Sequence, residues 1–230
     1  MLRQVSLFHL KQKKWIMVFV IYLRYLIGGA FVYSSIPKIA GLRFTTASGE
    51  FEPINSWIHF FETLYRTGIY WNFLGWMQLL AGLLLMTQRY ATLGALGFLP
   101  ISLNIFVITV SLDFNGTPYI TGLILAANLF LLLWDIYKLR FLLEVDSGQD
   151  ILIKSHHDSF MYHSFWTYLG VLMFCTTVYI KLIHQSSIIF WGLLCILEGL
   201  SGLAIFLVFR KTSTNTTPYN DKGIAQTPSR

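Results

Sequence analysis

The sequence predicts an all-α protein, a polytopic membrane helical bundle, and three observations lead to that class. Of its 230 residues, 55% are hydrophobic and only 12% are charged, about half the charged share of an average soluble chain. The mean hydropathy is +0.58. Several long stretches are almost free of charge, and about 20 such residues suffice to cross a bilayer as a helix. This composition excludes a water-soluble globular core.

Six apolar stretches are the predicted spans, because only a helix satisfies every backbone polar group locally in lipid. Very short connections after the second and fifth spans make each of these an antiparallel neighbour of the span that follows. The approximate ranges are Trp15–Pro37, Trp71–Gln88, Ala91–Leu112, Tyr119–Tyr137, Met161–Ile183 and Ser187–Phe209.

The basic residues predict the orientation. Twelve lysines and arginines fall on the side that holds the N-terminus, whereas Lys38, Arg43, Arg66 and Lys181 fall on the other, and Arg24 lies within the first span. By the positive-inside rule, we expect a multi-pass protein of the cell inner membrane with both termini in the cytoplasm. The net charge of +6 therefore reports topology, and we expect no nucleic-acid partner.

The chain divides into four predicted parts. Residues 1–143 form a four-helix module, residues 144–160 a cytoplasmic linker, residues 161–210 a transmembrane hairpin and residues 211–230 a disordered cytoplasmic tail. The first and second spans are separated by the one sizeable external segment. Its aromatic residues recur at helical spacing, which predicts an amphipathic helix near 55–68 that lies in the outer interface, with Asn55 as its cap.

Polar residues inside spans are costly and therefore mark candidate sites. Five spans each place one near the middle, and we expect these residues to form one layer at the bilayer midplane and to face the bundle interior. Lys38 and Asp135 extend the same helical stripes. The ligand-binding candidates are Arg24, Lys38, Gln78, Asn104, Asn128, Asp135 and Glu198. Amides also hold membrane helices together without any ligand, so both interpretations stay open.

Arg24 and Glu198 are the two charged members of the predicted layer. A central arginine costs roughly 2.5–3.5 kcal/mol on insertion scales. An ion pair that hydrophobic residues could replace contributes little to stability. We therefore consider a functional polar pocket at these two residues, and their direct pairing is a hypothesis that rests on shared depth alone.

Other chemistry finds little support in the sequence. Cys175 and Cys195 belong to no C-x-x-C motif, and buried thiols usually act as small hydrophobes. None of the six histidines is expected at mid-depth, so we predict no metal site. Phosphate-binding glycine loops, nucleophile elbows and zinc protease motifs are also missing from the sequence. The catalytic residues, if there are any, are unknown.

The first four spans resemble the DoxX family of small bacterial membrane proteins over residues of about 18–143. The resemblance is carried by the stretch from Leu23 to Lys38, by Gln78 to Leu85 followed by Arg89, and by Leu99-Pro100 with Leu103-Asn104. It implies a four-helix membrane module, and some DoxX relatives are subunits of a thiosulfate:quinone oxidoreductase. Gln78 stands where the family usually has a carboxylate, and the C-terminal hairpin is an addition to the module.

Three functions follow from these observations. The first is a redox-associated membrane subunit that binds a quinone in the midplane pocket and depends on a protein partner for electrons. The second is a carrier of a small polar or lipid-like solute, with the external amphipathic helix as a gate. The third is a non-catalytic assembly or scaffold subunit of a membrane complex. The bilayer itself is a partner in all three.

Overall fold

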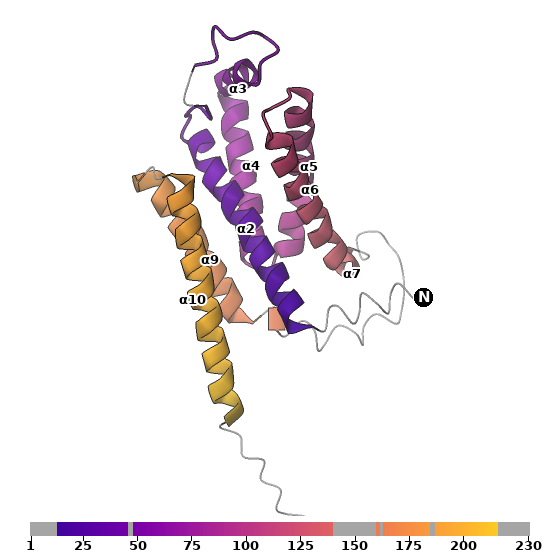
Figure 1. Ribbon diagram of the computed structural model, residues 1–230, viewed down its shortest axis with the longest axis vertical. Coiled ribbons are helices and arrows are strands. Elements are labelled where there is room, and N and C mark those ends of the chain that lie inside the picture. The colour runs from indigo at the N-terminus through magenta and orange to yellow at the C-terminus, as the bar shows by residue number, and fades with distance from the viewer. Residues whose placement is uncertain (1–12, 46–47, 140–159, 162, 185–186, 216–230) are drawn as a thin grey trace, which may run out of the picture.

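A computed structural model of the chain describes residues 13–45, 48–139, 160–161, 163–184 and 187–215. Over these residues the chain forms helices and connecting turns and contains no strand (Figure 1). Six of the helices are long and apolar enough to cross a membrane. The predicted class, an all-α polytopic bundle, is therefore confirmed.

The helices follow the predicted spans closely. They are α2 (Lys14–Ile39), α3 (Trp57–Arg66), α4 (Ile69–Met86), α5 (Ala91–Ser111), α6 (Thr117–Trp134), α7 (Ile136–Leu139), α9 (Ser164–Tyr179), the π-helical segment η2 (Ile180–His184) and α10 (Ile188–Asn215).

The first unit packs α2, α4, α5 and α6 side by side, with α2 and α4 in the most extensive contact (Figure 1). Small residues permit this approach. A Cβ added to Gly82 would lie 2.8 Å from the Gly28 carbonyl oxygen, and one added to Gly75 would lie 2.9 Å from the Ile39 nitrogen. Close backbone contact at small residues is the usual way in which helices associate within lipid.

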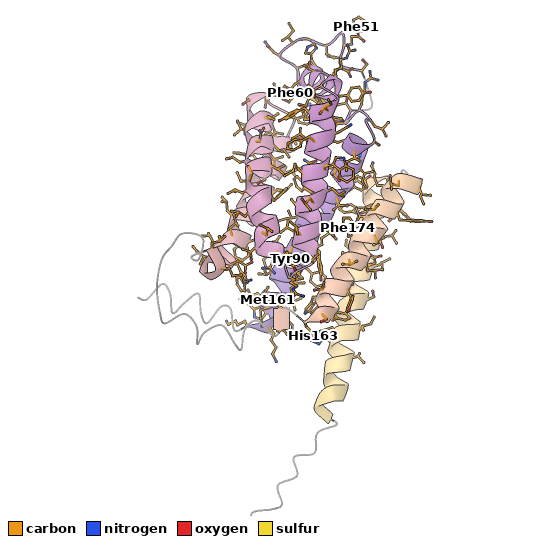
Figure 2. All side chains as sticks on the ribbon, turned by 180° about the vertical axis from the view of Figure 1, so that it is seen from behind. Phe51, Phe60, Tyr90, Met161, His163 and Phe174 are labelled. Carbon is orange, nitrogen blue, oxygen red and sulfur yellow. The ribbon has the colours of Figure 1, made fainter. Side chains whose placement is uncertain are left out.

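Helix α3 lies across one end of this unit (Figure 1), and Figure 2 shows Phe51 and Phe60 at that end, with Tyr90 toward the other. The helix begins one residue later than predicted, because Ser56 and not Asn55 is its cap: the Ser56 side chain accepts from the His59 N–H at 3.1 Å. Aromatic contacts hold α3 to the loop between α5 and α6. The Trp57 ring stacks on Phe114 with 4.1 Å between the centroids.

Helices α9 and α10 form a hairpin beside α2 (Figure 1). Helix α9 makes most of the contact with the first unit: the Tyr25 hydroxyl donates to the Trp166 carbonyl, and Thr167 Oγ1 donates to the Thr87 carbonyl at 2.9 Å. Figure 2 places Met161 and His163 at the start of this hairpin, at the end far from α3. The hairpin thus packs against its own four-helix unit along α2.

Helix α10 continues to Asn215, beyond residue 210, where we expected the hairpin to end. Most of the predicted linker, and residues 216–230 of the predicted tail, lie outside the described residues.

Candidate functional site: a polar network and an apolar slot

The most extensive polar contact inside the bundle is centred on Arg24, whose side chain is 1% exposed. Its Nη2 donates to Asp135 Oδ2 at 2.7 Å and its Nη1 donates to Gln88 Oε1 at 3.0 Å. Asp135 also accepts from Thr92 Oγ1 at 2.8 Å and from Lys138 Nζ at 3.1 Å. We call these five residues the Arg24 network.

Sequence reasoning missed three members of the network, Gln88, Thr92 and Lys138, and Gln88 is the most deeply buried of them. It appears in the sequence as one residue of a short turn, but it is only 1% exposed and has a positive φ of 58°. A residue with a Cβ is disfavoured in this left-handed region by roughly 1–2 kcal/mol. The side chain compensates by accepting from Arg24 and by donating its Nε2 to the Ile21 carbonyl at 3.4 Å. A glutamine at a helix-to-helix turn was the only signal available.

Arg24 therefore pairs with Asp135, and the hypothesis of an Arg24–Glu198 pair is wrong. Glu198 lies in the hairpin, where its Oε1 accepts from Thr176 Oγ1 at 2.6 Å. Its Oε2 is buried and has no hydrogen-bond partner among the described residues. The pairing by depth failed because it used distance from the helix ends, and the helices differ in length and are staggered.

Because of the same stagger, the predicted polar residues do not form one layer at the middle of the bundle. Ten residues of α2, about 15 Å of helix rise, precede Arg24 from Lys14 onward. Arg24 is nevertheless level with Gln88 in the turn between α4 and α5 and with Asp135 at the end of α6. Arg24 therefore lies at the end of the four-helix unit far from α3, and not at its centre.

Gln78 and Asn128 are buried inside the unit, at 4% and 0% exposure. Asn128 Nδ2 donates to the Ala95 carbonyl at 3.2 Å and so ties α6 to α5. Gln78 Oε1 and Asn128 Oδ1 are both without a hydrogen-bond partner within the described chain. One amide thus joins two helices, as interhelical amides commonly do.

Asn104 is exposed, contrary to the expectation that its stripe faces the interior. Gly97 and Pro100 on the same stripe are exposed as well. The buried face of α5 is instead built from small residues and one aromatic: Ala91, Gly94, Ala95, Phe98, Ser102 and Thr109. The predicted stripe was defined by Asn104, whereas the buried face of α5 is the one on which Gly94 lies against α4, where a Cβ would be 2.6 Å from the Leu85 nitrogen.

Lys38 is buried at the opposite end, beneath the segment that leads to α3. Its Nζ donates to the Ser34 carbonyl at 2.7 Å and lies 5.3 Å from the ring centroids of both Phe44 and Trp71. The lysine is therefore held by one carbonyl and two aromatic faces, a cation–π arrangement. It does not join the Arg24 network.

A second charged cluster holds α3 in place outside the spans. Glu62 is only 2% exposed and accepts from Arg43 Nε at 2.8 Å, from Arg66 Nε at 3.0 Å and from the Gly49 N–H at 3.4 Å. The hydrogen bond from Arg43, together with those from Arg66 and Gly49, lowers the pKa of Glu62 to about 2 against the opposing effect of burial. Glu62 thus anchors α3 to the segment that precedes it.

An apolar cavity lies between α2 and the hairpin, and we call it the α2–α10 slot. Its volume is about 380 Å³. Helix α2 contributes Phe19, Tyr22, Leu26 and Gly29 to its lining, and helix α10 contributes Trp191, Gly192, Cys195, Ile196 and Gly199. Met86 and Met173 contribute from α4 and α9. None of the seven predicted site residues lines the slot.

The polar atoms along the slot already have protein partners. The Tyr22 hydroxyl donates to the Gly199 carbonyl at 2.5 Å, and Trp191 Nε1 donates to Thr177 Oγ1 at 3.0 Å. The Tyr25 hydroxyl donates to the Trp166 carbonyl. The walls therefore present mainly hydrocarbon and aromatic surface to any occupant.

Metal ligation has no site in the described chain, where no three histidine, cysteine, aspartate or glutamate side chains gather closely enough to hold an ion. Comparison with protein-family models, with curated proteins and with solved structures finds no match.

Proposed function

We propose that this protein, with its six helices apolar enough to span a membrane, binds a lipid-like amphiphile in the α2–α10 slot and acts as a binding protein or carrier for it. The observation that carries the proposal is the cavity of about 380 Å³ with almost wholly apolar walls. Cavities of roughly 300–1,000 Å³ lined by apolar and aromatic side chains are typical ligand sites.

A quinone belongs to the same chemical class, since it carries a polar head on an apolar chain. A quinone head needs donors for its carbonyl oxygens, and the Tyr22 and Tyr25 hydroxyls already donate to backbone carbonyls. The slot therefore favours an occupant held by its chain, and the redox-associated role ranks behind simple amphiphile binding.

A scaffold role is the second candidate, and the Arg24 network favours it. Both terminal guanidinium nitrogens of Arg24 are engaged by side chains of its own chain. Such a network needs no ligand to satisfy it, which suits a structural element. A protein that uses its polar core only for packing would leave the slot to bulk lipid.

Membership of the DoxX family stays a proposal that rests on the sequence motifs of residues of about 18–143. The inner membrane and cytoplasmic termini are likewise proposed, from the twelve basic residues on one side against four on the other. Labelling of single cysteines near Lys14 and near Phe51 with a membrane-impermeant maleimide in intact cells tests this orientation. Labelling of the first site and not the second would reverse it.

The binding proposal is tested by filling the slot. Gly192 lines it, and a Cβ at this position has nothing within 4 Å, so Gly192→Phe projects into open space. Gly97 on the exposed face of α5 also has nothing within 4 Å, which makes Gly97→Phe a matched control far from the slot.

The full chain and both variants are purified in mild detergent, and their bound lipids are extracted for mass spectrometry. We expect the parent chain and Gly97→Phe to carry a stoichiometric amphiphile that Gly192→Phe has lost, with all three equally folded. Identical lipid profiles in the three proteins, matching the bulk membrane, would overturn the proposal and favour the scaffold role.

A further inference from the structure

The α2–α10 slot is elongated along the helix axes. On α2 its lining residues run from Phe19 to Gly29, about 15 Å of helix rise. The two helices are antiparallel across it: Tyr22 contacts Gly199 near one end, and at the other end a Cβ on Gly29 would lie 3.2 Å from the Trp191 ring. A slot this long, with a volume near the lower end of ligand sites, fits one extended chain.

A basic side chain lies near one end of the slot. At the Trp191 end, the Tyr33 ring lies against the Trp191 ring with 5.0 Å between the centroids, and Lys181 Nζ lies 4.3 Å from the Tyr33 centroid. An ammonium group is thus one aromatic ring away from the slot wall. Within the described residues, no carboxylate lies within ion-pair distance of Lys181.

The backbone at Lys181 is also unusual. The residue belongs to η2, the π-helical segment with which the α9 helix ends. π-Helical turns are rare, and those found inside α-helices are frequently located at functional sites. The acidic side chain of the hairpin, Glu198, accepts from Thr176 Oγ1 at 2.6 Å and does not line the slot.

We infer that the occupant is a single-chain amphiphile with an anionic headgroup, whose chain fills the α2–α10 slot and whose headgroup is held by Lys181 beside Tyr33 and Trp191. The inference rests on the proposed function and adds its ligand class. A lysine at the membrane surface attracts an anionic headgroup by about 1 kcal/mol, which corresponds to roughly fivefold in affinity.

The test uses oleate and oleyl alcohol, two probes that share a chain and differ in charge. Binding of each to the purified full chain is measured by native mass spectrometry in a nonionic detergent. For each protein, the affinity for oleate is divided by the affinity for oleyl alcohol. This preference is then divided by the preference of Lys181→Gln, so that the partition of the probes into micelles cancels. We expect a ratio of roughly five for the parent chain, and for Lys181→Arg, which keeps the charge.

Lys14→Gln is the matched control, because it removes the same charge from the other end of α2 and should keep the ratio. A ratio near one for the parent chain, with Gly192→Phe still abolishing both probes, would overturn the headgroup assignment and leave the proposed function standing. Binding of neither probe to the parent chain would overturn both. A ratio lost equally in Lys14→Gln would show a general surface-charge effect and would also overturn the assignment.

Discussion

Arg24 Nη2 donates to Asp135 Oδ2 at 2.7 Å, and this contact joins the first spanning helix to the end of the fourth across 111 positions of the chain. Both side chains are buried, at 1% and 7% exposure. The two members of a buried ion pair are strongly coupled, because removal of one side chain leaves the charge of the other buried without compensation.

Arg24→Leu should therefore destabilise the protein by about 3–5 kcal/mol, because Asp135 would stay buried with less positive charge near it. The double variant Arg24→Leu with Asp135→Leu should recover a large part of that loss. Thermal unfolding in detergent measures both. Strictly additive effects of the two substitutions would show that the pair is not coupled.

Glu198→Gln should leave stability unchanged or raise it slightly. The variant keeps the oxygen that accepts from Thr176, while it removes a charge whose second oxygen has no hydrogen-bond partner within the described chain. Thr176→Val removes the donor instead and should cost about 1–3 kcal/mol. A loss in Glu198→Gln as large as that in Arg24→Leu would show that the charge of Glu198 stabilises the fold and would contradict this prediction.

Gly170→Ala should weaken the contact between α9 and the first unit. A Cβ at this position would clash with the Met86 backbone carbonyl, which cannot turn away as a side chain can. Gly97→Ala is the control, since its Cβ meets nothing within 4 Å and alanine favours helix over glycine by about 1 kcal/mol. We expect a lower unfolding midpoint for the first variant and an equal or higher one for the second; equal midpoints would contradict the close contact.

The anchoring of α3 should depend on acid pH. The pKa of Glu62 in the folded protein is about 2, below the ordinary value of 4.5, because Arg43 and Arg66 donate to its charged form. A depressed pKa stabilises the fold above the ordinary value, and this contribution is lost as the pH falls from about 4.5 to about 2.

The measurement is the fluorescence of Trp57, which stacks on Phe114, taken as the difference between the parent chain and Trp57→Phe. We expect an acid transition in that pH range. Glu62→Gln should show the acid-type signal already at neutral pH, with no transition. A transition that persists unchanged in Glu62→Gln would assign it to another group.

The sequence by itself determined the helical class and the six spans, because the length and apolarity of each stretch leave a helix as the one local solution in lipid. It also located the external helix to within two residues at each end, since its aromatic spacing is a local pattern. It identified both Arg24 and Asp135 as candidate site residues, because polar side chains within spans are costly.

Tertiary structure alone decided which of these residues meet. Arg24 pairs with Asp135 and not with Glu198, and Asn104 is exposed. The spacing of residues along one helix does not reveal how helices of unequal length are staggered or where small residues let them pack. Gln88 became a central residue only when α2 came to lie against the turn that holds it. The slot has the same origin. It lies between α2 and α10, which contact each other at Tyr22 with Gly199 and at Gly29 with Trp191, and these residues are far apart in the chain.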